Sequence, residues 1–81
     1  MRIDKFLKVS RVIKRRTVAN EACDLGRVKV NDKVAKAFHE VKVGDIVEIK
    51  FGENWVKFEV LNVAQSIKKE DASNMVKLIE E

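Results

Sequence analysis

The stretch Gly26-Arg27-Val28-Lys29-Val30-Asn31-Asp32 marks the point at which the periodicity of the chain changes. Before Gly26 the apolar residues recur every three or four positions, as on one face of a helix, and after it they alternate with polar residues, as in a strand. Glycine is the usual residue for the left-handed conformation that ends a helix, and Asn31-Asp32 predicts a turn. The sequence therefore predicts helices before residue 26 and an antiparallel sheet after it.

Two short helices are expected before Gly26. The face of the first consists of Ile3, Phe6, Leu7, Ser10 and Ile13, which follow a 3.6-residue period. The second is predicted over residues 18–25, with Thr17 as its N-cap and with an inner face of Val18, Ala19, Ala22 and Cys23. Asp4 is expected to cap the first helix or to orient a neighbouring cation. The two helices form a hairpin with cations at its corner.

The second half of the chain predicts further strands and a closing helix. A returning strand is expected at residues 34–35, and two more at 46–51 and 55–60, separated by a turn at 52–54. The closing helix is predicted from the spacing of Ala72, Met75, Val76 and Ile79. The predicted fold class is α+β, in a single domain over residues 1–81, where 1–50 form the core and 51–81 add a strand and the C-terminal helix.

Charge is segregated along the chain. Residues 1–36 contain eleven Lys and Arg against four Asp and Glu, a net charge of +7, whereas residues 37–81 have a net charge of −3. Five of the basic residues are arginines around the helical hairpin and the following strand, and a guanidinium matches the geometry of phosphate oxygens. This asymmetry favours a polyanionic partner, usually nucleic acid and sometimes an anionic membrane.

Enzymatic and metal-dependent functions find little support in the sequence. The chain of 81 residues has one histidine, His39, and one cysteine, Cys23, so it lacks a zinc-ligand set. It also lacks a glycine-rich phosphate loop and a paired acid and base, and we expect a non-catalytic protein without cofactors. No apolar run is long enough to cross a membrane, and the charged start does not resemble a signal peptide, so we expect a cytoplasmic protein. Trp55 either stacks on a base or wraps the edge of the sheet.

Four motifs occur in an order that identifies a family. They are Arg2-Ile3-Asp4-Lys5-Phe6-Leu7, Arg16-x-x-Ala19, Gly26-Arg27-Val28-Lys29-Val30-Asn31 and Val41-x-Val43-Gly44-Asp45. Together they resemble, over residues 1–50, the S-four RNA-binding domain, which is named for ribosomal small-subunit protein four. The resemblance implies an α-L motif, in which two antiparallel helices pack on a small antiparallel sheet. One departure is Asp32, where the family usually has glycine, and it places a negative charge near the expected RNA surface.

The resemblance also implies which residues face RNA. Positions that match the motifs are Arg2, Arg16, Arg27, Lys29 and Asn31. The same surface is extended by Lys5, Lys8, Arg11, Lys14, Arg15 and Thr17. No metal-binding or catalytic residue is implied.

A stand-alone chain of this size is similar to the ribosome-associated heat-shock members of the S-four family, and especially to those of bacterial ribosome-associated quality control. That similarity implies a factor that binds ribosomal RNA and peptidyl-tRNA on obstructed large ribosomal subunits, and we expect the protein to be monomeric. It would support C-terminal alanine tailing of the stalled chain alongside an RqcH-like tailing factor. Two alternatives stay open: a DNA-binding helix-turn-helix module, and a protein-interaction or membrane-surface adaptor.

Overall fold

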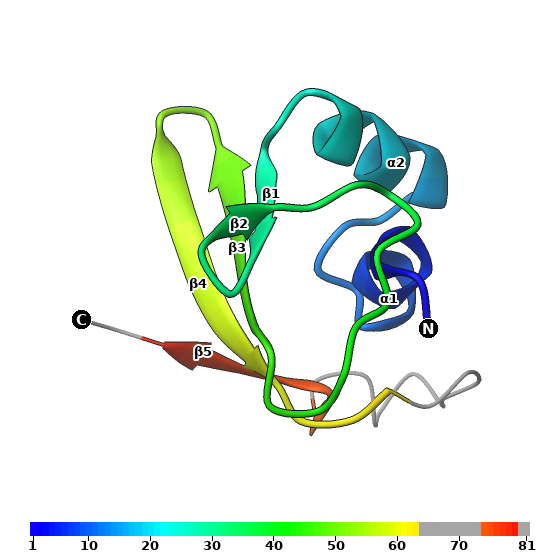
Figure 1. Ribbon diagram of the computed structural model, residues 1–81, viewed down its shortest axis with the longest axis vertical. Coiled ribbons are helices and arrows are strands. Elements are labelled where there is room, and N and C mark those ends of the chain that lie inside the picture. The colour runs from blue at the N-terminus through cyan, green and yellow to red at the C-terminus, as the bar shows by residue number, and fades with distance from the viewer. Residues whose placement is uncertain (64–73, 80–81) are drawn as a thin grey trace.

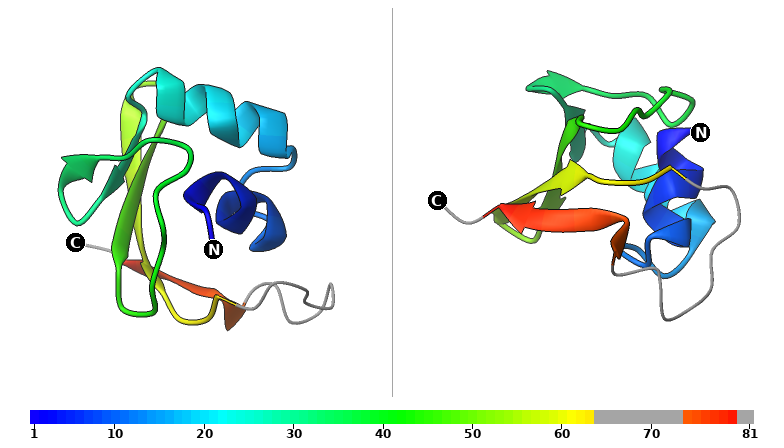
Figure 2. Two further views of the ribbon diagram at one scale, coloured as in Figure 1. Left: turned by 45° about the vertical axis from the view of Figure 1, so that its right-hand side comes forward. Right: turned by 90° about the horizontal axis from the view of Figure 1, so that it is seen from below.

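The computed structural model describes residues 1–63 and 74–79, which form an α+β fold (Figure 1). Its elements are α1 (Ile3–Val9), α2 (Arg16–Asp24), β1 (Val28–Val30), β2 (Lys33–Val34), β3 (Ile46–Phe51), β4 (Asn54–Val60) and β5 (Val76–Ile79). The five strands form one antiparallel sheet in the order β2-β1-β3-β4-β5. Both helices lie on the same side of this sheet, as the turned views in Figure 2 show. The predicted α+β class, with two helices packed on an antiparallel sheet, is confirmed.

The hydrophobic core lies between the helices and the inner face of the sheet. From α1, Ile3, Phe6 and Leu7 are all inaccessible to solvent. The sheet contributes alternate residues of its central strands, such as Val47 in β3 and Phe58 in β4, which are directly opposite each other in the register. Alternation works here because successive side chains in a strand point to opposite faces of the sheet. This packing fixes the helical hairpin against β1 and β3.

The first helix is shorter than the sequence pattern predicts. It ends at Val9, and Arg11 takes a left-handed conformation with φ of 64°. Ser10 and Ile13 are nevertheless buried, as the pattern predicts. Ile13 reaches the core because its amide donates a hydrogen bond of 3.0 Å to the Leu7 carbonyl, which folds the chain back over the end of α1. The apolar spacing therefore identifies the buried side chains correctly but overestimates the helix.

The second helix begins earlier than predicted. Arg15 is the extended residue before α2, so Thr17 lies in the first turn and is not the N-cap. Val18, expected on the inner face, is 48% exposed, whereas Ala19 and Cys23 are buried. At the other end, Gly26 has a φ of 72° and donates to the Cys23 carbonyl at 3.0 Å. With the 2.9 Å bond from the Arg27 amide to the Ala22 carbonyl, this completes a glycine-terminated helix end.

The first four strands and the turns between them are confirmed, with small shifts in bounds. The returning strand is Lys33–Val34 and leaves out Ala35, and Asn54, predicted in the turn, begins β4. Asn31 and Asp32 have φ angles of 51° and 69° in the turn between β1 and β2. Asn and Asp tolerate this left-handed region better than other side chains, so Asp32 occupies a position where glycine would also fit. The β3–β4 hairpin turns at Gly52, whose φ is 62°.

The predicted C-terminal helix is wrong for the residues that the structure describes. Val76–Ile79 is a strand, β5, which pairs with β4 from Val60↔Val76 to Lys57↔Ile79. Met75, which precedes β5, is completely buried, and Val76 packs against the core from the start of the strand. As a strand, residues 76–79 form backbone hydrogen bonds with the open edge of β4. A short helix in the same place would be only marginally stable by itself and would leave that edge unpaired. Ala72, part of the same prediction, lies outside the described residues.

Cys23 should be unreactive in the folded protein. The thiol is buried beside the core, and this burial, with Asp4 and Asp24 contributing, raises its pKa to about 11. Because the thiolate is the reacting species, we expect negligible labelling by a disulfide reagent at pH 8. Urea-unfolded protein should react at once under the same conditions. Equal labelling rates for the folded and unfolded protein would contradict the burial of Cys23.

Candidate RNA-binding site

The hairpin of α1 and α2 is organised around a buried carboxylate, Asp4, which is 2% exposed. Its Oδ2 accepts hydrogen bonds from Arg2 Nη2 at 3.1 Å and from Asn20 Nδ2 at 3.3 Å. Its Oδ1 accepts from the Lys5 amide at 2.8 Å and from Arg16 Nη2 at 3.4 Å. The prediction that Asp4 orients a neighbouring cation is confirmed, and Asp4 orients two.

Arg2 and Arg16 present their remaining guanidinium donors to solvent. Their side chains are 46% and 45% exposed although each is ion-paired to the same carboxylate. They line a shallow depression of the surface together with Asp4, Thr17, Asn20, Glu21 and Asp24. A guanidinium has five N–H donors, so one ion pair leaves several for phosphate oxygens. Holding both groups on one anchor fixes their spacing and reduces the side-chain entropy lost on binding.

The pKa of Asp4 lies below its ordinary value. Burial opposes this by favouring the neutral acid, but hydrogen bonds from Asn20, the Lys5 amide and Arg16 outweigh it, and the positive charge of Arg16 adds to them. Asp4 is therefore ionised at neutral pH. Asp4, Arg2 and Arg16 then contribute one negative and two positive charges, while the carboxylates of Glu21 and Asp24 line the same depression.

Asp4→Asn should destabilise the protein at neutral pH by about 1–3 kcal/mol, the value of a lost set of charge-assisted hydrogen bonds. Because the folded pKa of Asp4 is lowered, its stabilisation is complete above the ordinary value of 3.8 and is lost as the pH falls through the folded pKa. The difference in the free energy of unfolding between wild type and variant should therefore be large at pH 7 and should disappear as the pH falls below 3.8. Urea denaturation followed by circular dichroism measures it.

Asp24→Asn is the matched control for this prediction. Asp24 is exposed, lines the same depression and makes no ion pair within the described residues. The Asp24→Asn substitution should leave the free energy of unfolding nearly unchanged at every pH. Equal losses in the two variants would contradict the role of Asp4 as an anchor.

Other predicted residues surround the cluster without joining it. Lys8 lies in the last turn of α1, and Arg11, Lys14 and Arg15 lie between α1 and α2; all four are exposed. Lys5 is half-buried. None of these five residues lines the depression, and Lys14 lines a separate groove beside the β3–β4 hairpin.

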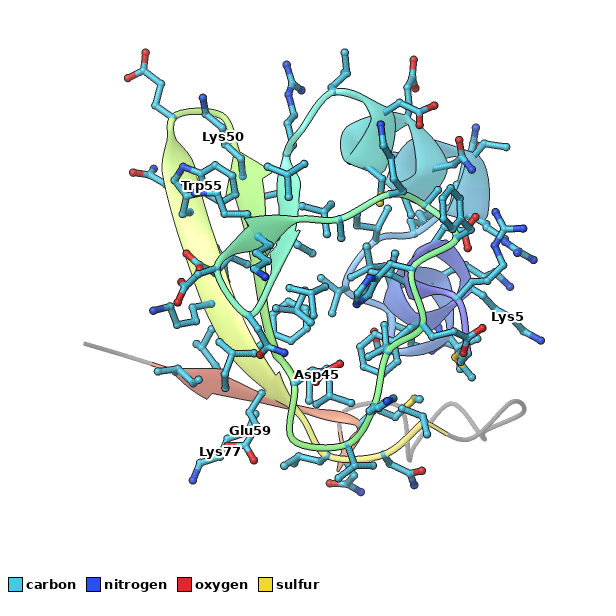
Figure 3. All side chains as sticks on the ribbon, in the orientation of Figure 1. Lys5, Asp45, Lys50, Trp55, Glu59 and Lys77 are labelled. Carbon is cyan, nitrogen blue, oxygen red and sulfur yellow. The ribbon has the colours of Figure 1, made fainter. Side chains whose placement is uncertain are left out.

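The predicted residues of β1 lie away from the Asp4 cluster. Lys29 points to the outer face of the sheet, because its neighbours Val28 and Val30 are buried on the inner face. Its Nζ lies 4.5 Å from the centroid of the Trp55 ring. Figure 3 shows Trp55 and Lys5 on opposite sides of the molecule. Trp55 thus packs against a lysine of the sheet, and the structure does not bring Lys29 into the hairpin surface.

Asn31 is engaged within the protein. Its Nδ2 donates to Asp45 Oδ1 at 3.2 Å and its Oδ1 accepts from the Ile46 amide at 3.0 Å. Asp45, labelled in Figure 3, in turn accepts from the Lys42 amide at 2.9 Å. Asn31 therefore ties the β1–β2 turn to the start of β3. Arg27, in contrast, is exposed immediately before β1.

Asn20 is the residue of the cluster that sequence reasoning missed. It lies four positions after Arg16, which places both side chains on one face of α2. That spacing indicates that Asn20 lies beside Arg16. It does not indicate that the buried carboxylate of Asp4 faces Asn20, because that contact depends on how the two helices pack.

The comparison of the sequence with protein families supports an RNA-binding role for the helical hairpin. The S4 domain matches residues 1–47, which comprise α1, α2, β1, β2 and the start of β3. The chain belongs to the S4 domain family. S4 domains are non-catalytic RNA-binding modules, and the Asp4 cluster lies on the hairpin within the matched region.

Full-length relatives of this S4 domain protein carry the name RQC P-site tRNA stabilizing factor. The protein from Streptococcus pneumoniae is 54% identical over 81 residues, covering all of this chain and 92% of the relative. That from Bacillus subtilis is 48% identical over the whole chain and 94% of the relative. A Helicobacter pylori relative is 38% identical over 78% of this chain and 75% of its own length.

Solved structures show the same S4 domain fold. Heat Shock Protein 15 of Vibrio cholerae, described as trimeric, superposes with a TM-score of 0.88 at 21% identity, over 98% of this chain and 81% of that one. A solution structure of a hypothetical protein gives a TM-score of 0.84 at 30% identity, over 100% and 99% of the two chains. Within residues 1–63 and 74–79, neither helix is long or apolar enough to span a bilayer.

Proposed function

We propose that this protein is a stabilizing factor for P-site tRNA in ribosome-associated quality control. It binds ribosomal RNA and peptidyl-tRNA on obstructed large ribosomal subunits in the cytoplasm. The protein itself is non-catalytic. By holding the peptidyl-tRNA in place, it supports an RqcH-like factor that adds C-terminal alanine residues to the stalled chain.

The observation that carries this proposal is the arginine pair on Asp4. Arg2 immediately precedes α1 and Arg16 is the first residue of α2, and their shared carboxylate holds both half-exposed guanidiniums at one depression. Structured RNA offers phosphates at fixed spacings, and a fixed pair of guanidiniums can read such a spacing without reading sequence. The names of the full-length relatives supply the ribosomal context.

Electrostatics supports the assignment to RNA. The hairpin and the first strand hold most of the positive charge of the chain, and a protein that neutralises phosphates releases condensed counterions. With about six phosphate contacts, affinity should fall by about a thousandfold between about 50 and 200 mM salt. A docking surface for an uncharged protein would show a far weaker dependence.

The direct test uses purified large ribosomal subunits with and without bound peptidyl-tRNA. We expect the protein to co-sediment with both, and to be retained at higher salt when peptidyl-tRNA is present. Adding it to a tailing reaction with an RqcH-like factor should increase the alanine added per stalled chain. Equal retention on both kinds of subunit would contradict tRNA stabilisation. Equal competition by duplex DNA and ribosomal RNA would favour the helix-turn-helix alternative instead.

A further inference from the structure

A second basic surface lies where α2 approaches the β3–β4 hairpin. It is a groove of about 360 Å³, and none of the carboxylates in the described residues lines it. Its apolar wall includes Val18, Ala22 and Phe51, and its cations are Lys14, Arg27 and Lys50. The depression at Asp4 differs in that Glu21 and Asp24 also line it.

The groove exists because β3 is longer than its neighbour β1. β1 pairs with β3 only up to Val28↔Ile49, so Lys50 and Phe51 extend past the start of β1. The Lys50 amide still donates to the Arg27 carbonyl at 2.9 Å, which holds Arg27 beside this extension. Phe51 belongs to the inward-facing set of β3 but is 45% exposed. An aromatic ring is thus left accessible next to a cation.

The cations of the groove are available to a ligand. Lys14, Arg27 and Lys50 are exposed, and none of them makes an ion pair within residues 1–63 and 74–79. Exposed cations beside an apolar wall suit an anionic ligand that also has a flat apolar part. A nucleotide meets both requirements, because its base can stack on an aromatic ring while its phosphates contact the cations.

We propose that this groove is a second RNA contact, which takes an unpaired nucleotide of a loop or single strand. The base stacks on Phe51, and the flanking phosphates contact Lys14 and Arg27, because the Lys50 side chain leaves the opposite face of β3 beside Trp55. The proposal rests on the proposed RNA-binding function and extends it, because Arg2 and Arg16 contact structured RNA elsewhere on the molecule. The protein then binds RNA at two surfaces: the depression at Asp4 contacts the backbone of structured RNA, and the groove at Phe51 takes an unpaired base.

The test uses a fluorescently labelled oligomer, because Trp55, the single tryptophan of the chain, lies opposite Lys50 in the β3–β4 register and does not line the groove. Figure 3 shows the two side chains at the same end of the sheet. The full-length protein is titrated with a single-stranded uridine oligomer of about twelve nucleotides, within the size range of such sites. Phe51→Leu keeps an apolar side chain but removes the stacking surface. Phe38→Leu is the matched control, because Phe38 is also exposed and does not line the groove.

We expect the fluorescence anisotropy of the labelled oligomer to rise on binding to wild type, and Phe51→Leu to weaken binding by at least about tenfold. Phe38→Leu should bind as wild type does. Equal affinities for all three proteins would overturn the groove as a nucleotide site. Competition by a glutamate-rich peptide as effective as that by unlabelled oligomer would also overturn it, in favour of an acidic protein segment.

The same proteins are tested for co-sedimentation with large ribosomal subunits. If wild type sediments with subunits but shows no oligomer binding, the groove proposal fails and the proposed function stands. If wild type binds the oligomer through Phe51 but does not sediment with subunits, the proposed function fails and the groove stands.

Discussion

Arg16→Ala should reduce co-sedimentation with large ribosomal subunits to background, and Arg2→Ala should do the same. Each substitution removes one of the two guanidiniums that Asp4 holds in place. The fold should survive, because both side chains are about half exposed and Asp4 keeps Asn20 and the Lys5 amide as hydrogen-bond donors. Arg16→Lys should give an intermediate loss, because lysine keeps the charge but not the planar fork.

Lys77→Ala is the control with the same change in charge. Lys77 lies in β5 opposite Glu59 in the β4–β5 register, away from the helical hairpin (Figure 3). Its co-sedimentation should stay close to that of wild type, and circular dichroism should show a folded protein for every variant. Normal co-sedimentation of both Arg16→Ala and Arg2→Ala would rule out the assignment of the site.

Phe6→Ala should cause the largest loss of stability, about 3–5 kcal/mol in the free energy of unfolding. Phe6 is completely buried between α1 and the sheet, so truncation leaves a cavity in the centre of a small core. A domain of this size has few kcal/mol to lose. A change of 1 kcal/mol shifts the melting temperature of such a domain by about 4–8 °C, so a loss above about 12 °C is expected. Thermal unfolding followed by circular dichroism measures it.

Phe38→Ala makes the same chemical change at an exposed position, since 68% of Phe38 is accessible. Its melting temperature should stay within a few degrees of wild type. Similar losses in the two variants would show that Phe6 does not occupy the core position described here.

Local periodicity predicts much of this fold. The change from a helical to an alternating pattern at Gly26 locates the boundary between hairpin and sheet, and the structure confirms it with a positive φ at that residue. The buried residues between Ile3 and Ile13 follow from spacing alone, although α1 itself ends at Val9. Spacing fails at the helix ends, because these depend on single backbone conformations such as the left-handed Arg11.

Tertiary contacts explain what the sequence could not predict. Residues 75–79 have helical spacing, yet Val76–Ile79 is a strand because the edge of β4 is open to pairing. The predicted basic surface also divides in two, since Lys29 lies on the outer face of the sheet with Trp55. Linear charge counts cannot separate two faces of one strand. The link from Asn20 to Asp4 spans sixteen positions and is visible only after the helices pack.

RNA crosslinking in cells, mapped to single nucleotides, tests the central claim most directly. The account predicts crosslinks concentrated in large-subunit ribosomal RNA around the P site and in tRNA, and their loss in Arg16→Ala. Crosslinks scattered over messenger RNA, with the large subunit and tRNA not enriched, would contradict it.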